Sequence, residues 1–114
     1  MHDCIFCKIL SGEIPSSPVY EDDQVIAFRD IHPQAPVHIL VVPRAHIPYP
    51  SSIRREHESL AGHMVAVAGE IAQKEGFEET GYRLVMNHRE SAGQSVFHIH
   101  LHILAGRPFA WPPG

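Results

Sequence analysis

Residues 98–104 alternate strictly between histidine and aliphatic side chains and read His-Ile-His-Leu-His-Ile-Leu. Alternation with a period of two is typical of a half-buried β-strand, because successive side chains point to opposite faces. The sequence therefore predicts a strand whose aliphatic face packs on a core, while His98, His100 and His102 lie in a row on the other face. Three imidazoles in one row indicate chemistry rather than a merely polar surface.

The spacing of the row limits which chemistry it can support. Alternate residues on a strand lie about 6.5–7 Å apart, and His98 and His102 about 13 Å apart. A metal–imidazole bond is only about 2 Å long. The row alone therefore does not predict a metal centre with three histidine ligands. One or two of the imidazoles could still bind a metal, and the other natural role is that of a nucleophile or general acid–base.

The composition is that of an ordinary globular chain of 114 residues, with 44% hydrophobic and 19% charged residues. The net charge is −4 and no run of Lys or Arg stands out, so we expect no binding to nucleic acid. A few backbone N–H groups could nevertheless hold a small phosphate ligand. No apolar stretch has the length of a signal peptide or a membrane span, which predicts a cytoplasmic protein without membrane association.

Hydrophobic periodicity predicts a short helix, five strands and one long helix. The short helix covers 4–10, the strands cover 19–21, 25–29, 38–42, 82–86 and 98–104, and the long helix covers 54–74. Gly76 is a fitting end for the long helix. Strands joined by short connections favour an α+β fold, in which an antiparallel sheet of about five strands is covered by the long helix. The proline-rich tail predicts no regular structure.

A polar loop, Ser91-Ala92-Gly93-Gln94-Ser95, leads directly into the histidine strand. Gly93 permits a positive φ, and successive N–H groups in such a loop can form an anion-binding nest. Ser95 stands an odd number of residues before His98, so a turn or bulge near Val96 is needed to aim its hydroxyl at the histidine face. Beside the histidines, the loop predicts a phosphate site.

Asp30 follows the strand 25–29. A carboxylate at the end of a strand can accept hydrogen bonds from ribose hydroxyls. The simpler interpretation is a turn-forming Asp ahead of Pro33. The residues by themselves favour the turn.

Cys4-x-x-Cys7 has the spacing of a zinc-binding pair, which needs two further ligands. His46 and His98 are candidates, and the other candidates are His2, His38, His57, His63 and His88. Two inert, buried thiols are the alternative interpretation. A redox pair is disfavoured because no βαβ unit follows. In the cytoplasm a disulfide is not expected.

The histidine motif resembles that of the histidine triad (HIT) family, and segments along almost the whole chain resemble its Hint branch. These segments are Ile5-Phe6, Gly12-Glu13-Ile14-Pro15, Glu21-Asp22-Asp23, Ala27-Phe28-Arg29-Asp30-Ile31, Pro33-Gln34-Ala35-Pro36, Gly81-Tyr82-Arg83, Gly93-Gln94-Ser95-Val96 and Trp111-Pro112-Pro113-Gly114. The resemblance implies a single HIT domain over residues 1–114, a sheet continued across a homodimer, and purine nucleoside phosphoramidase activity.

The same resemblance implies a role for each candidate residue. His100 would attack the α-phosphorus of a purine nucleoside 5′-phosphoramidate and form a nucleotidyl-histidine, with His98 supporting it. The implied nucleotide contacts are His102 and the Gly93–Gln94–Ser95 segment at the phosphate, Ser95 also at the leaving group, Asp30 at the ribose, Phe28 and Ile31 at the base, Asn87 beside the loop, and Trp111 reaching the partner's site.

Family members that keep the cysteine pair resemble zinc proteins, and the implied ligands here are Cys4, Cys7, His46 and His98. This zinc would be structural, because catalysis in the family needs no cofactor. Two other functions stay open. One is hydrolysis of dinucleoside polyphosphates, and the other is a non-catalytic interaction protein that binds nucleotides.

Overall fold

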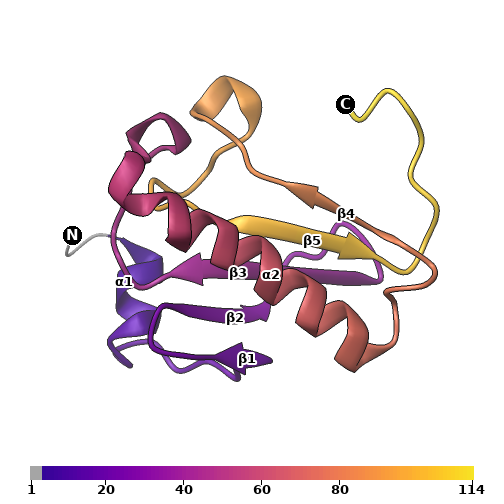
Figure 1. The fold of residues 1–114 in the computed structure, drawn as a ribbon, viewed down its shortest axis with the longest axis horizontal. Coiled ribbons are helices and arrows are strands. Elements are labelled where there is room, and N and C mark those ends of the chain that lie inside the picture. The colour runs from indigo at the N-terminus through magenta and orange to yellow at the C-terminus, as the bar shows by residue number, and fades with distance from the viewer. Residues whose placement is uncertain (1–3) are drawn as a thin grey trace.

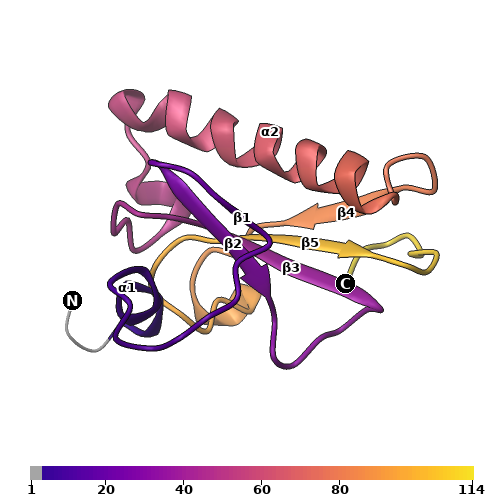
Figure 2. The same ribbon diagram turned by 90° about the horizontal axis from the view of Figure 1, so that it is seen from below.

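The computed structural model describes residues 4–114, and within them one five-stranded sheet has a helix on each face (Figures 1 and 2). The elements are α1 (Ile5–Leu10), β1 (Tyr20–Glu21), β2 (Val25–Arg29), β3 (Val37–Pro43), α2 (Glu58–Glu75), β4 (Tyr82–Val85) and β5 (Leu101–Ala105), with 3₁₀ turns at Pro50–Ser52, Arg55–His57 and Glu90–Ala92. The strand order is β1-β2-β3-β5-β4, and every neighbouring pair is antiparallel. The predicted α+β fold is confirmed.

Both faces of the central strands are apolar, but they pack against different helices. One face packs on α2 and contains Val25, Ala27, Ile39, Val41, Ile99, Leu101 and Ile103, which meet Met64, Val67, Ala68 and Ile71 of the helix. The other face carries Ile26, Phe28, Leu40 and Val42, which surround Phe6 of α1. Figure 2 shows the two helices on opposite sides of the sheet. The α2 side is therefore the main core, while α1 covers only part of the other side.

The long helix ends where the sequence predicts. Gly76 has φ 85°, and its N–H donates to the carbonyl of Ala72 at 3.0 Å. Phe77 also donates to Ala72, at 3.0 Å, so the last turn is closed by two backbone bonds. A glycine tolerates this left-handed conformation without steric cost. The regular α-helix begins at Glu58, preceded by the 3₁₀ turn.

The histidine strand is shorter than predicted, because β5 begins only at Leu101. In the β3–β5 ladder the last pair is Val41–Leu101, and the same register continued would join Val42 to His100 and then Pro43 to Ile99. Pro43 has no N–H to donate, and its carbonyl already accepts from Nε2 of His98 at 2.7 Å. Ile99 instead donates to the carbonyl of Ile47 at 2.7 Å. The alternation of faces nevertheless persists through residues 98–100, because Ile99 packs in the α2 core.

The turn between β1 and β2 is tied to α2 through Asp22. Its Oδ1 accepts from the backbone N–H groups of Gln24 (2.7 Å) and Val25 (2.9 Å). Its Oδ2 accepts from the hydroxyl of Tyr20 (2.7 Å) and from Nε2 of His63 (2.6 Å). Burial alone would raise the pKa of Asp22, but these hydrogen bonds outweigh it and hold that pKa well below its ordinary value.

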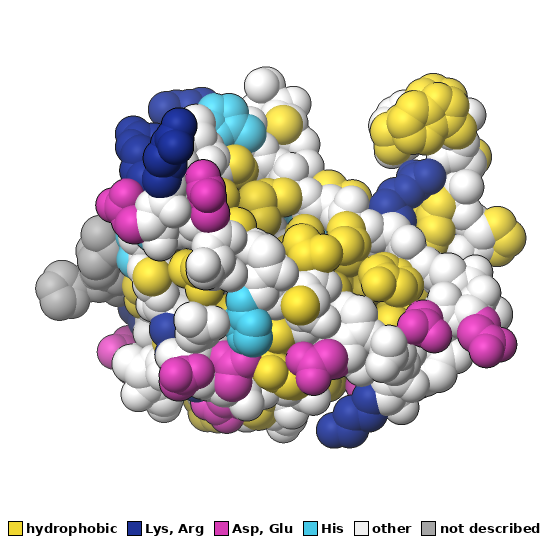
Figure 3. Space-filling model, in the orientation of Figure 1, with side chains coloured by type: hydrophobic (Ala, Val, Ile, Leu, Met, Phe, Trp, Pro, Cys, Tyr) yellow, Lys and Arg dark blue, Asp and Glu magenta, His cyan; other side chains and the backbone are white. Residues whose placement is uncertain are grey.

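The C-terminal segment after β5 has no regular structure, as expected. It stands clear of the body beside the free edge of β4 and ends in hydrophobic side chains (Figures 1 and 3). Trp111 is 83% exposed there. Arg83 of β4 anchors the segment by donating to the carbonyl of Ala110 at 2.9 Å. Within residues 4–114, no helix combines the length and the apolar character needed to cross a membrane.

The Asp22 network predicts a specific pH dependence of stability. Because the pKa of Asp22 is depressed in the folded state, its contribution is full above the unfolded-state pKa of about 3.9 and is lost as pH falls through the folded-state value. We expect Asp22→Asn to lower the free energy of unfolding at pH 7 by about 1–2 kcal/mol. Urea titrations of both proteins from pH 7 down to pH 3 should show this difference shrinking at the acid end. A difference that stays constant with pH would contradict the role of the ionised carboxylate.

Candidate active site

A cavity of about 690 Å³ opens on the α1 face of the sheet. Six of the predicted site residues line it: Phe28, Asp30, Ile31, Ser95, His100 and His102. The rest of the wall is largely apolar and comes from α1 and the segment after it, including Ile5, Phe6, Ile9, Ile14 and Pro15. A concave apolar wall with a few polar groups converging on one end is typical of a small-molecule site.

His100 lies at the polar end with one ring nitrogen free. The ring is 6% exposed, and its Nδ1 lies 2.8 Å from the carbonyl oxygen of His98. A carbonyl can only accept, so Nδ1 carries the proton and donates. Burial, as the largest influence, lowers the pKa of His100, and the ring is neutral near pH 7. Its Nε2 therefore carries an unprotonated lone pair, as a nucleophile requires.

A chain of hydrogen bonds sets the opposite tautomer in His102. The backbone N–H of Gln34 donates to Nδ1 of His38 at 3.0 Å, so the proton of neutral His38 is on Nε2. That Nε2–H donates to Nδ1 of His102 at 2.9 Å, which leaves the proton of His102 on its own Nε2. Burial lowers the pKa of His38 and brings that of His102 to about 4, so both rings are neutral.

The N–H at Nε2 of His102 has no partner within residues 4–114, although it is buried. A buried donor without an acceptor is costly, and a ligand oxygen in the cavity would satisfy it. His102 therefore offers a hydrogen-bond donor beside the bare nitrogen of His100, with ring centroids 4.9 Å apart.

Asp30 completes this end of the cavity. Its Oδ1 accepts from the backbone N–H of His32 at 2.8 Å, and its Oδ2 lies 3.6 Å from Nε2 of His38. Ligand atoms of Asp30, His38 and His102 lie within 4.8 Å of one another, as in a metal site. The tautomers argue against one, because Nε2 of His38 carries a proton that a metal would have to displace while Nδ1 is committed to Gln34. Asp30, His38 and His102 are therefore better described as a chain of hydrogen-bonding groups whose carboxylate, that of Asp30, lines the cavity.

His98 lies behind the cavity wall and joins the predicted cysteine pair. Its Nε2–H donates to Pro43, which leaves Nδ1 bare and 3.4 Å from Sγ of Cys4 and 3.7 Å from Sγ of Cys7. Nδ1 of His46 lies 3.3 Å from Sγ of Cys7. The four ligand atoms lie within 4.8 Å of one another. His2, another candidate ligand, lies outside the described residues.

These four residues fit a tetrahedral zinc ion. Bonds of about 2.3 Å to sulfur and about 2.0–2.1 Å to nitrogen place neighbouring ligand atoms about 3.3–3.8 Å apart. The three measured sulfur–nitrogen distances fall in that range. Burial and the neighbouring Cys4 raise the pKa of the Cys7 thiol, so a bound cation is what would hold two thiolates together here.

The loop before the histidines folds so that Ser95 reaches the cavity. A bend covers residues 96–98, as the position of Ser95 requires. Gly93 has φ 105°, and a Cβ there would lie 3.5 Å from Nδ2 of Asn87, so the Asn87 side chain packs on the loop. Gln94 is only 2% exposed and its amide bonds to backbone groups, which turns it away from the cavity.

Two residues, Trp111 and His38, differ from the other predicted site residues. The sequence predicts Trp111 in the partner's site, and in one chain it projects from the tail and is not among the residues that line the cavity. Sequence reasoning weighed His38 only as a metal ligand, whereas it fixes the proton of His102. The signal that could have found it is a histidine in an otherwise apolar central strand, since such a group needs a hydrogen-bond partner.

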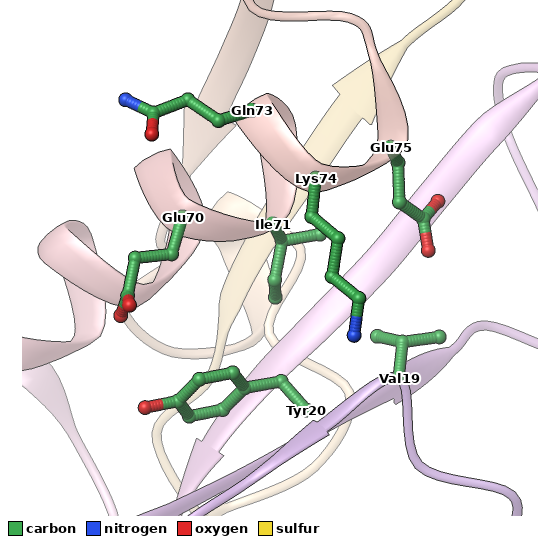
Figure 4. A pocket seen from close by; sticks show the side chains of 7 residues that line it. All are labelled: Val19, Tyr20, Glu70, Ile71, Gln73, Lys74 and Glu75. Carbon is green, nitrogen blue, oxygen red and sulfur yellow. The ribbon is translucent and has the colours of Figure 1, made fainter.

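A second hollow of about 480 Å³ lies between α2 and β1, on the other side of the sheet (Figure 4). Its walls are Val19, Tyr20, Glu70, Ile71, Gln73, Lys74 and Glu75. Lys74 extends from α2 towards the strand, between two glutamates. These side chains include no imidazole or thiol, so the chemistry that the sequence predicts belongs to the α1 face.

Comparisons with known proteins agree with this geometry. Residues 11–109 match the family model described as the HIT domain. The purine nucleoside phosphoramidase of Escherichia coli K12 is 54% identical over 106 residues, which cover 93% of this chain and 89% of that protein. The crystal structure of a HIT family hydrolase from Legionella pneumophila is 48% identical with a TM-score of 0.95, covering 98% of this chain and all of the other. A histidine triad protein from Clostridium difficile is 47% identical with a TM-score of 0.92, covering 96% of both chains.

Proposed function

This chain belongs to the HIT domain family, and on that premise we propose that it hydrolyses purine nucleoside 5′-phosphoramidates to the nucleoside monophosphate and an amine. The observation that carries the proposal is the pair of complementary tautomers in the cavity. His100 presents a bare Nε2, and His102 presents an Nε2–H that finds no acceptor among residues 4–114. A phosphoryl group supplies both an electrophilic phosphorus and acceptor oxygens.

The reaction proceeds in two displacements at phosphorus. Nε2 of His100 attacks the α-phosphorus, the phosphorus–nitrogen bond breaks, and the leaving nitrogen takes up a proton from solvent and departs as the amine. The attack makes the His100 ring cationic, and the carbonyl of His98 stabilises it by accepting the Nδ1–H. Water then attacks the same phosphorus, loses one proton to solvent, and releases the monophosphate and neutral His100. His102 donates to a non-bridging oxygen throughout, and that bond strengthens as charge develops.

The remaining residues position the nucleoside and the phosphate. The Asp30 carboxylate accepts from the ribose hydroxyls, and the apolar wall that includes Phe28 and Ile31 packs on the base. The backbone from Gly93 to Ser95 holds phosphate oxygens, with Asn87 packed behind it. The hydroxyl of Ser95 bonds near the leaving amine. Gln94 contributes through the loop that it ties down, because its amide is bound internally.

We propose that residues 1–114 act as one domain and that two copies form a homodimer through β4. This strand is at the edge of the sheet, so its outer backbone groups are available to a second β4. The tail is anchored on β4 through Arg83 and stands beyond that edge (Figure 1). In a dimer it would carry Trp111 towards the partner's cavity, where the leaving group lies.

We further propose that Cys4, Cys7, His46 and His98 hold one structural zinc ion. The ion would cross-link α1 to His98 and would take no part in bond breaking. Cys4 also caps α1, because its Sγ accepts from the backbone N–H of Cys7 at 3.4 Å. Thiols that bind zinc require reducing conditions, which supports a cytoplasmic location.

Replacing the nucleophile should stop the reaction but not binding. We expect His100→Ala to lower kcat on adenosine 5′-phosphoramidate at least about a thousandfold, while the Kd for AMP, measured by calorimetry, stays nearly unchanged. Mass spectrometry of a quenched reaction should find a nucleotide adduct on the unsubstituted chain and none on the variant.

The control for this variant is His57→Ala, which removes an imidazole in the turn before α2 and should leave kcat unchanged. Normal turnover by His100→Ala would overturn the mechanism. Faster cleavage of diadenosine polyphosphates than of phosphoramidates would favour the first alternative function. Nucleotide binding without turnover of either substrate would favour a non-catalytic binding protein.

Metal analysis of protein purified without added metal tests the zinc site. We expect about one zinc ion per chain, and close to none in Cys4→Ser. Serine is a good helix cap, so this variant retains the cap of α1 and loses only the thiolate ligand. Its melting temperature should fall, since α1 is no longer cross-linked. Unsubstituted protein that carries no zinc would remove the site.

The dimer is tested by light scattering in solution. We expect a mass of twice the 12.8 kDa of one chain. Trp111→Ala should keep that mass but change the relative rates for different leaving amines, because the exposed indole serves the partner's cavity rather than its own fold. A mass of a single chain, or unchanged amine selectivity, would contradict the respective part of this proposal.

A further inference from the structure

Arg89 has a backbone conformation that arginine rarely adopts. Within residues 4–114 it is the one non-glycine residue with a positive φ, at φ 68° and ψ 175°. This combination belongs to a region that glycine occupies almost alone. Such strain persists only where the surroundings hold it, and it clusters at functional sites. Arg89 precedes the 3₁₀ turn Glu90–Ala92, which leads into Gly93 and Ser95.

Reciprocal hydrogen bonds hold the strained backbone. The N–H of Arg89 donates to Oε1 of Gln94 at 2.7 Å. The carbonyl of Arg89 accepts from the N–H groups of Gln94 at 3.0 Å and Ala92 at 3.2 Å. The loop from 89 to 94 is thus closed at its base by Arg89 and Gln94. The positive φ of Arg89 accompanies an arrangement in which both its N–H and its carbonyl meet Gln94.

The side chain of Arg89 contacts residues 48–49, the segment to which Gln94 also ties the loop. Its guanidinium lies over the ring of Tyr49, 4.0 Å from the centroid. This distance is typical of a cation–π contact. The amide of Gln94 donates to the carbonyl of Pro48 at 2.7 Å and to that of Val96 at 3.0 Å. Residues 48 and 49 therefore receive both the side chain of Arg89 and the residue that closes the loop.

The strain has no role in the main core. The residues of this loop are exposed apart from Gln94. The loop leads to Ser95, which lines the cavity together with His100. The residues on either side of Ser95, Gln94 and Val96, are joined by a hydrogen bond of the same network. A fixed loop matters most where oriented N–H groups and a hydroxyl must meet a reacting phosphate.

We propose that Arg89 is a positioning residue: its stack on Tyr49 holds the strained backbone that presents the Gly93–Ser95 segment to the phosphate. The proposal rests on the proposed function, because it assigns that segment to the phosphate. It gives Arg89 no contact with the substrate. The stack on Tyr49 and the bonds to Gln94 offset the unfavourable backbone conformation together.

Two substitutions at this position separate the stack from the strain. Arg89→Ala removes the stack but keeps a Cβ, so the loop should relax away from its strained conformation. Arg89→Gly removes the stack and the strain together, so the loop can keep its conformation. We expect Arg89→Ala to lower kcat on adenosine 5′-phosphoramidate about tenfold or more while KM changes less, and Arg89→Gly to stay within about threefold of the unsubstituted chain.

We therefore expect the glycine variant to be more active than the alanine variant. A general loss of stability would give the reverse order, because glycine loses more conformational entropy on folding than alanine. Arg55→Ala removes an exposed arginine in the turn before α2 and serves as the matched control. Tyr49→Leu should behave like Arg89→Ala, since it removes the other half of the stack.

Amide hydrogen exchange reads the loop directly and does not depend on activity. The N–H groups of Ala92, Gly93 and Gln94 should exchange about tenfold faster in Arg89→Ala and near the original rate in Arg89→Gly. Unchanged exchange rates in Arg89→Ala would overturn the proposal, whether or not kcat falls. If kcat fell while the exchange rates stayed the same, Arg89 would act by contacting the substrate rather than by holding the loop. If the unsubstituted chain cleaves no phosphoramidate, the proposed function fails, and the exchange rates alone decide the part of Arg89.

Discussion

The hydrogen bond from Nε2 of His98 to the carbonyl of Pro43 determines much of the site. Pro43 has no N–H, so the β3–β5 ladder stops at this point, and its carbonyl is free to accept from a side chain. The bond fixes the proton of His98 on Nε2 and aims the bare Nδ1 at Cys4 and Cys7. Because the ladder has stopped, the carbonyl of His98 is free to accept from His100.

Backbone groups therefore decide the protonation of every ring in the row. A carbonyl beside Nδ1 leaves Nε2 of His100 bare, as the proposed nucleophile requires. The backbone N–H of Gln34, acting through His38, leaves a proton on Nε2 of His102. Burial keeps all these rings neutral. His100 and His102 lie two positions apart on the same face, and they differ in tautomer because their Nδ1 atoms contact different groups.

The sequence predicts the faces of the elements better than their exact pairing. Alternation located His98, His100 and His102 on one side, and helical periodicity located α2 and its end at Gly76, because both patterns report local burial. The late start of β5 depends on which residue of β3 lies opposite, and this register is not written in either strand alone. The inward turn of Gln94 and the link from His38 to His102 likewise join segments 46 and 64 residues apart.

The short helix α1 shows how a small fold brings two tasks together. Its six residues are too few for independent stability, so its position depends on contacts at its ends and along one side. Cys4 and Cys7 face His98 and His46, while Phe6 packs edge-on against the rings of His98 and His100 at 5.8 and 5.0 Å. Since Phe6 also lines the cavity, whatever fixes the two cysteines also fixes the wall on which a base would pack and the ring that covers His100.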